Sequence, residues 1–141
     1  MQPIYTAEAT AYGARTGTVV TNDGRLDLTL SRPSEMGGDG GSGTNPEQLF
    51  AAGYAACFHS AMRFALKPEG LTASALQGSK VAAKVHFLKA GEGEFGLGVD
   101  LDVHLPEVDE EQARKVAERT HQICPYSKAI RDNVDVHINI V

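Results

Sequence analysis

The two cysteines of this chain, Cys57 and Cys124, are the side chains best suited to chemistry. Two thiols are too few for a disulfide scaffold, and cytosolic thiols are normally kept reduced, so a pair that matters there is more typical of catalysis or redox chemistry. The pair lacks C-x-x-C spacing, which excludes a thioredoxin-type motif. Folding can still bring the thiols together, so that one attacks and the other captures the resulting sulfenic acid. Alternatively, Cys57 is a small core hydrophobe, the commonest role of free cysteine.

Histidine offers a second kind of chemistry, but its spacing in the sequence gives weak support. His121-x-x-Cys124 is at best half of a metal site. A cysteine hydrolase or acyl transferase would pair Cys57 with His59 or His121. However, His59 lies two residues further along the same predicted helix and faces away from the thiol. A non-catalytic small-ligand-binding stress protein, in which Cys57 only packs, is the alternative from a different functional class.

A single long helix over residues 45–66 is predicted to hold Cys57. Asn45 can cap its first turn, Pro46 suits the first helical position, and Gln48 stands three residues after the cap. Apolar residues occur all round the helix after this turn, with Arg63 as the only charge, which predicts burial on most sides. The uncharged run is short and is interrupted by polar side chains, so a membrane span is not favoured.

Alternating apolar and polar residues predict six strands around this helix. A second helix is predicted from Asp109, with Gln112 three residues after this cap. It should end near Ile123 because Pro125 disfavours its continuation. Such an order is typical of an α+β chain, and one small sheet and one helix cannot cover a helix that is apolar all round, so we infer a homodimer. The strands are expected at residues 3–12, 18–21, 26–31, 81–87, 99–105 and 134–140.

Composition and charge narrow the organisation and the partners of the chain. The 141 residues, 42% of them hydrophobic, suit a single domain over residues 1–141 with one core. The net charge of -5 and the scattered basic residues indicate neither nucleic acid nor an anionic membrane as a partner. The N-terminal residues show no basic segment followed by an apolar run, so a cytoplasmic location is expected.

A glycine-rich loop at residues 31–44 precedes the long helix. Such a loop before a helix N-terminus can hold phosphate. However, no Lys-Ser/Thr follows its last glycine, and a dinucleotide fingerprint complete with its downstream acid is absent, so nucleotide binding is not favoured. The length and glycine content of the loop predict mobility and make it a candidate lid.

Two segments carry a resemblance to a known family: NPEQLFAAGYAACF at residues 45–58 and HQICPYS at residues 121–127. They strongly resemble the OsmC/Ohr family and are most similar to its organic hydroperoxide resistance (Ohr) branch. The turn at residues 13–17 and the glycine-rich loop fit the same pattern, so the resemblance covers essentially the whole chain. It implies an OsmC/Ohr-like intertwined homodimer with antiparallel sheets wrapped around two long central helices.

The resemblance also implies an activity and a set of site residues. The chain would be a thiol-dependent peroxidase that reduces organic hydroperoxides to alcohols, with Cys57 as the peroxidatic cysteine and Cys124 as the resolving one. Arg15 and Glu47 match the active-site arginine and glutamate of the family. Neither a bound cofactor nor a metal is implied, and the external dithiol reductant would be the dihydrolipoyl group of a partner protein.

Physical chemistry indicates how Arg15 and Glu47 would contribute. Cys57 lies about three turns into its helix, where the helix dipole is weak, so Arg15 is the better candidate to stabilise the thiolate. Glu47 paired with Arg15 would fix the guanidinium plane through two hydrogen bonds. Apolar surroundings would favour alkyl or lipid-derived hydroperoxides over hydrogen peroxide. The chain departs from the family pattern at Ala14 and Asp132, where glycine is common, and the loop around Arg15 is the part that these departures put in doubt.

Overall fold

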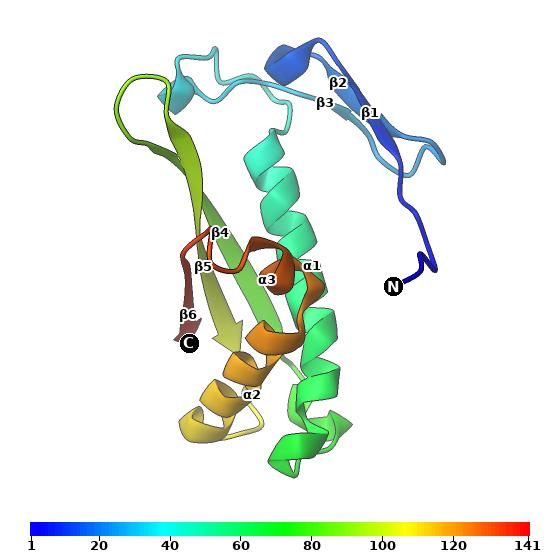
Figure 1. Cartoon of the computed structure of the whole chain (residues 1–141), viewed down its shortest axis with the longest axis vertical. Helices are drawn as coiled ribbons and strands as arrows, with labels where there is room; N and C mark the ends of the chain where they lie inside the picture. The colour runs from blue at the N-terminus through cyan, green and yellow to red at the C-terminus, as the bar shows by residue number, and fades with distance from the viewer. The chain divides into compact units, whose positions relative to one another are not determined.

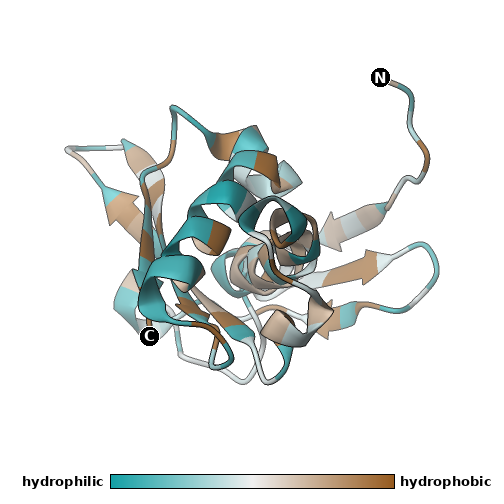
Figure 2. Ribbon diagram, turned by 90° about the horizontal axis from the view of Figure 1, so that it is seen from below, coloured by the Kyte–Doolittle hydropathy of each residue, from teal (hydrophilic) through white to brown (hydrophobic).

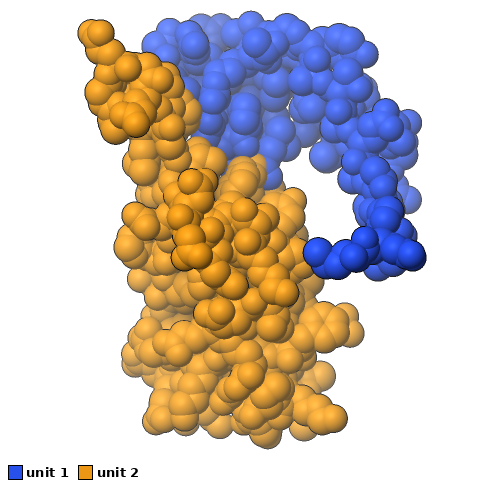
Figure 3. All heavy atoms as spheres, in the orientation of Figure 1, with its two compact units in different colours: residues 1–49 blue, residues 50–141 orange.

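The computed structural model describes all residues, 1–141, as two compact units. Unit 1 comprises residues 1–49 and unit 2 residues 50–141 (Figure 3), and each is described by itself below. The chain contains both helices and two separate sheets (Figure 1), which confirms the predicted α+β class. None of its helices is long and apolar enough to cross a membrane.

Unit 1 is built on an antiparallel sheet in the order β1-β2-β3. The strand predicted at residues 18–21 is confirmed, whereas β1 begins at Ala9 and not at residue 3. The reason is that β2 is only four residues long and pairs with residues 9–12 alone. The elements of the unit are β1 (Ala9–Tyr12), η1 (Ala14–Thr16), β2 (Thr18–Thr21), β3 (Asp27–Thr29) and η2 (Ser34–Met36), where η denotes a 3-10 helix.

The glycine-rich loop that follows β3 is shaped by its own backbone contacts. Gly38 lies so close to the carbonyl oxygen of Arg32 that an added Cβ would come within 2.1 Å of it. At Gly43 the same atom would meet the backbone carbon of Leu30 at 2.6 Å. Close backbone approach therefore accounts for glycine at these two positions. Mobility of the loop stays a prediction.

Helix α1 (Pro46–Ala65) begins in unit 1 and runs on into unit 2 (Figure 1). Its predicted start is confirmed, because the side chain of Asn45 accepts a hydrogen bond from the Gln48 amide at 2.8 Å. Within one chain, however, the helix is not buried on most sides. One face is buried (Tyr54, Phe58, Ala61, Met62 and Ala65), whereas another is exposed (Ala52, Ala56, Ser60 and Phe64).

The sheet of unit 2 consists of β4 (Lys80–Lys89), β5 (Phe95–His104) and β6 (Val136–Ile140). Strands β4 and β5 form the predicted antiparallel hairpin. Strand β6 pairs with β5 in parallel, so this sheet is mixed and not purely antiparallel. The chain reaches β6 through a helical crossover after β5, and a crossover of this kind returns a strand in parallel.

The crossover contains α2 (Glu110–Ile123) and α3 (Pro125–Ile130). Asp109 accepts a hydrogen bond from the Gln112 amide at 2.8 Å, and α2 ends at Ile123, both as predicted. Hydrophilic and hydrophobic residues alternate along α2 (Figure 2), as expected of a helix with one buried face. Short 3-10 helices, η3 (Lys67–Glu69) and η4 (Ala73–Leu76), precede the sheet.

One hydrophobic core lies at the centre of unit 2. The buried face of α1 packs there with inward-facing residues of β5 and the apolar face of α2. Cys124 belongs to this core as well. The core residues outside α1 include Val99, Leu101 and Val103 of β5 and Ala113, Val116 and Ala117 of α2.

Candidate active site

The two cysteines, both free, meet inside unit 2. Cys57 lies near the middle of α1 and is partly buried, while Cys124 stands between α2 and α3. Their sulfur atoms are 3.6 Å apart, with the Cys124 thiol donating toward the Cys57 sulfur. The two thiols are therefore within reach of one another, as a redox pair requires.

Cys124 is enclosed although it stands at a helix end, directly before Pro125. Its side chain is completely buried. Its amide donates to the Thr120 carbonyl at 2.8 Å, and its own carbonyl accepts from the Lys128 amide at 2.9 Å. These bonds belong to the end of α2 and the start of α3. The corner between these two helices, at Cys124, therefore turns inward and places the thiol in the core.

The surroundings of Cys57 within unit 2 do not favour ionisation. Burial raises the pKa of the Cys57 thiol, and the neighbouring Cys124 raises it further, through the hydrogen bond between the two thiols and through the repulsion of two thiolates. The backbone N–H of Tyr126 favours the thiolate and opposes this rise only in part. An ordinary cysteine, with a pKa near about 8.5, is already mostly protonated at neutral pH. Positive charge from another source would therefore be needed to make Cys57 a nucleophile.

An apolar cavity of about 480 Å³ opens beside Cys57. Cys124 is not among the residues that line it, so only one of the two sulfurs faces this space. The only polar side chain in the lining besides the thiol is that of Ser60. The lining consists of Cys57, Ser60, Ala61, Phe64, Ile123 and Pro125.

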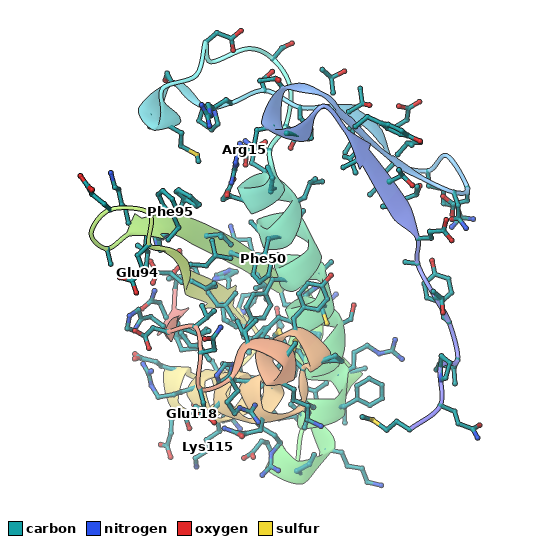
Figure 4. All side chains as sticks on the ribbon, turned by 45° about the horizontal axis from the view of Figure 1, so that its top comes forward. Arg15, Phe50, Glu94, Phe95, Lys115 and Glu118 are labelled. Carbon is teal, nitrogen blue, oxygen red and sulfur yellow. The ribbon has the colours of Figure 1, made fainter.

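Arg15 and Glu47 form an ion pair within unit 1. The two guanidinium nitrogens donate to the two carboxylate oxygens, Nη1 to Oε2 at 2.9 Å and Nη2 to Oε1 at 2.7 Å. This hydrogen bonding raises the pKa of Arg15 and lowers that of Glu47, so both groups stay charged. Figure 4 shows Arg15 near the first turn of α1, where Glu47 lies. The geometry is the bidentate pairing that was predicted from the sequence.

Tyr54 and Ser127 are polar residues near the thiols that the sequence reasoning missed. The Tyr54 hydroxyl and the Ser127 hydroxyl share a hydrogen bond of 2.7 Å, and both residues are completely buried. His121 Nδ1 lies 2.9 Å from the same serine oxygen. Burial lowers the pKa of His121, and so does the charge of Arg131, which keeps the imidazole neutral near pH 7.

The two histidines considered as bases for Cys57 have other partners. His59 Nε2 shares a hydrogen bond of 2.9 Å with Ser79, while His121 bonds to Ser127. This arrangement gives no support to a cysteine–histidine hydrolase. No group of three or more His, Cys, Asp or Glu side chains is placed to hold a metal ion.

The sequence of this chain is similar to a known protein family and to several of its curated members. The family model of OsmC-like proteins matches residues 38–139. An organic hydroperoxide resistance protein of Xanthomonas axonopodis pv. citri is 44% identical over 137 residues, which cover 97% of this chain and 94% of that protein. The organic hydroperoxide resistance protein OhrB of Bacillus subtilis is 40% identical, covering 97% and 98% of the two chains.

Solved structures give the same result for the fold. The crystal structure of an organic hydroperoxide resistance protein from Legionella pneumophila matches with a TM-score of 0.89 at 42% identity, covering 99% of this chain and 98% of that one. The crystal structure of OhrB from Bacillus subtilis matches with a TM-score of 0.87 at 39% identity, covering 99% and 100%.

Proposed function

Because this chain belongs to the OsmC-like family, in its organic hydroperoxide resistance branch, we propose that it is a cysteine-based peroxidase that reduces organic hydroperoxides to alcohols. The observation that carries the proposal is the distance of 3.6 Å between the sulfurs of Cys57 and Cys124. Two free thiols this close can form a disulfide after a small adjustment, because a sulfur–sulfur bond is about 2.05 Å long.

In the first step, the Cys57 thiolate attacks the distal oxygen of the hydroperoxide. The O–O bond breaks, the alkoxide takes up a proton and leaves as the alcohol, and Cys57 becomes a sulfenic acid. Orienting the peroxide and stabilising the charge of the breaking bond are the larger sources of rate. We assign both tasks to the guanidinium of Arg15, and we assign Glu47 the task of holding its plane.

In the second step, the sulfur of Cys124 attacks the sulfenic sulfur of Cys57. The S–O bond breaks, the hydroxyl leaves as water with the thiol proton of Cys124, and a disulfide forms. The reductant is an external dithiol, for which we propose the dihydrolipoyl group of a partner protein. One of its thiolates attacks Cys57, which faces the cavity, and the buried Cys124 leaves as the thiolate. The second thiol of the reductant then attacks the mixed disulfide. Cys57 leaves as the thiolate, and the reductant forms its own internal disulfide.

The apolar cavity supports an organic substrate. A side chain of carbon atoms on the peroxide would displace water from Ala61 and Ile123, and burial of apolar surface contributes roughly 25 cal/mol per Å². Hydrogen peroxide has no such surface to bury. Alkyl and lipid-derived hydroperoxides are therefore the proposed substrate class.

We also propose that the active form is an intertwined homodimer, in the cytoplasm. Helix α1 exposes one face in a single chain, including Phe64, whose side chain is 73% exposed. In unit 1, Leu30 is the only buried residue. A second copy of the chain would supply the surface that these elements lack.

Steady-state turnover tests the proposed function. The purified chain should consume cumene hydroperoxide and tert-butyl hydroperoxide in the presence of dihydrolipoamide, with kcat/KM at least about tenfold above that for hydrogen peroxide, since an apolar pocket discriminates by about 1–3 kcal/mol. Cys57→Ser should abolish the reaction. Turnover that survives in Cys57→Ser, or equal efficiency on hydrogen peroxide, would contradict the proposal.

A further inference from the structure

A second contact, parallel to that of the two cysteines, joins the same two parts of unit 2. Tyr54 stands three residues before Cys57 on α1, and Ser127 stands three residues after Cys124 on α3. Their hydroxyls share a hydrogen bond of 2.7 Å, alongside the 3.6 Å contact of the sulfurs. On α1, three residues are nearly one turn, so Tyr54 and Cys57 lie on the same side of that helix. Cys124 directly precedes α3, and Ser127 lies in the first turn of α3. The hydroxyl pair therefore lies one turn away from the reacting pair.

The hydroxyl pair is completely buried, and its bonding is complete. Neither Tyr54 nor Ser127 is exposed, so water does not compete for the bond. Burial raises the pKa of Tyr54, so the phenol keeps its proton and stays a hydrogen-bonding partner. Ser127 also bonds to His121 Nδ1 at 2.9 Å. Loss of one member would leave a buried polar atom unpaired, which costs about 1–3 kcal/mol.

The corner that carries Cys124 is closed on itself by a separate group. The Arg131 guanidinium, at the end of α3, donates to the His121 carbonyl at 2.7 Å and to the Gln122 carbonyl at 3.4 Å. These carbonyls belong to the last turn of α2, which has no helical partners for them. Arg131 therefore fixes the angle of the corner, whereas the Tyr54 hydroxyl links the corner to α1 through a bond between two side chains.

We propose that Tyr54, Ser127 and His121 are positioning residues for the resolving step, holding the Cys124 corner against α1 at the register in which its sulfur meets Cys57. This inference rests on the proposed peroxidase function. The hydrogen bonds among Tyr54, Ser127 and His121 matter after the hydroperoxide has oxidised Cys57. At that stage the sulfenic acid on Cys57 either forms the disulfide or is oxidised further to sulfinic acid. Attack by Cys124 is intramolecular, and a misplacement of about 1 Å can cost such a step about 100-fold. Oxidation by a second peroxide does not involve Cys124 at all.

The test is the partition between disulfide and sulfinic acid. Samples of reduced protein are each mixed with a different excess of tert-butyl hydroperoxide, without reductant, and quenched with acid. The intact mass of the protein in each sample is then measured by mass spectrometry. Tyr54→Phe, which removes one oxygen and changes no apolar volume, should reach half conversion to sulfinic acid at about tenfold less hydroperoxide than the unchanged chain. Because both outcomes start from the same sulfenic acid, this ratio does not depend on how fast the first step runs.

Two further variants and a matched control separate positioning from general loosening. Ser127→Ala should behave like Tyr54→Phe, while Ser127→Thr keeps the hydroxyl and should restore most of the disulfide. Thr120→Val is the control, since Thr120 is also buried and its hydroxyl donates to the Val116 carbonyl at 2.7 Å, and not to Tyr54, Ser127 or His121. Its partition should match that of the unchanged chain.

The possible outcomes distinguish this inference from the function on which it rests. An unchanged partition in Tyr54→Phe and Ser127→Ala would overturn the positioning role and leave the peroxidase intact. An equal rise of sulfinic acid in Thr120→Val would also overturn it, because any loss of a buried hydroxyl would then have the same effect. If the unchanged chain forms no disulfide, the proposed function fails, and the inference fails with it.

Discussion

The side chains around Cys57 set a condition on the chemistry of the site. Burial and the adjacent Cys124 raise the pKa of the Cys57 thiol, so unit 2 alone keeps it protonated at neutral pH. We propose that the guanidinium of Arg15 offsets this effect, and its pairing with Glu47 keeps Arg15 charged over the whole physiological range. The role of Arg15 can therefore be tested through the ionisation of Cys57.

Arg15→Gln should raise the midpoint of Cys57 ionisation and lower kcat/KM by about 100-fold, since oriented charges of this kind contribute about 2.7–4 kcal/mol. The sign follows from charge: without a nearby cation the thiolate is less stable, so a higher pH is needed to form it. Arg15→Lys should also be far from neutral, because an ammonium cannot make the two-pronged contact. The rate of thiol alkylation by monobromobimane against pH measures the midpoint.

Arg25→Gln is the matched control for this prediction. Arg25 also lies in unit 1, but its side chain is 89% exposed and pairs only with its neighbour Asp23 at 3.6 Å. In Arg25→Gln, the ionisation midpoint of Cys57 and the turnover should equal those of the unchanged chain. An Arg15→Gln variant that equals them as well would exclude the proposed role.

At this scale the meeting of the two cysteines was open from the residues alone, and the resemblance to the family supplied Arg15 and Glu47 as site residues. The bidentate pair of Arg15 and Glu47 is present, and the two cysteines meet. The Tyr54–Ser127 bond could not be predicted, because a tyrosine and a serine in helical stretches are ordinary residues until their separate elements are packed together. The only available signal was that each stands three residues from a cysteine.

At the scale of elements, the turns on which two site segments depend contain unusual backbone. Only two residues other than glycine have positive φ, Ala14 at 52° and Asp132 at 63°. These are the two positions at which the resemblance led us to expect glycine. The left-handed region costs an ordinary L-residue about 1–2 kcal/mol, less for aspartate, which bonds locally. The chain therefore places residues other than glycine in left-handed backbone at both turns.

Ala14→Gly should stabilise the protein by about 0.5–1 kcal/mol, because relief of the left-handed strain outweighs the extra entropy of the unfolded chain. Asp132→Gly should give a smaller gain. The control is Ala9→Gly in β1, which adds the same flexibility without relieving any strain and should destabilise. Urea unfolding midpoints measure all three. A loss of stability in Ala14→Gly equal to that in Ala9→Gly would show that the turn is not strained.

Most elements of unit 2 followed from local patterns, and the exceptions have a common cause. Residues close together in the sequence determine the capping by Asp109, the end of α2 and the β4–β5 hairpin. The parallel pairing of β6 and the burial of Cys124 depend on where the crossover returns the chain, which no local pattern contains. The same limit explains β1, whose length is set by its partner strand.

At the scale of the whole molecule, the exposed face of α1 is the feature that a single chain leaves unexplained. Ala52, Ala56, Ser60 and Phe64 recur every four residues and stay exposed beside a buried face. Small residues in such a row allow a second helix to approach closely. The predicted single domain over residues 1–141 stays a prediction.

Ala52→Glu should convert the proposed homodimer into monomers, because it would place an unpaired charge in a helix contact that excludes water. Sedimentation velocity at micromolar concentration measures the change, with the unchanged chain at twice the mass of one chain. Ala73→Glu, another exposed alanine replaced by the same side chain, should remain dimeric. A monomeric unchanged chain, or a dimeric Ala52→Glu, would rule out this helix contact.

The most direct test of the central claim is the non-reducing intact mass and thiol count of the protein before and after one equivalent of tert-butyl hydroperoxide. We predict loss of two hydrogens and of both thiols, abolished by Cys57→Ser and replaced by further oxidation of Cys57 in Cys124→Ser. Two thiols that remain unreactive would contradict the claim and would make Cys57 a packing residue of α1.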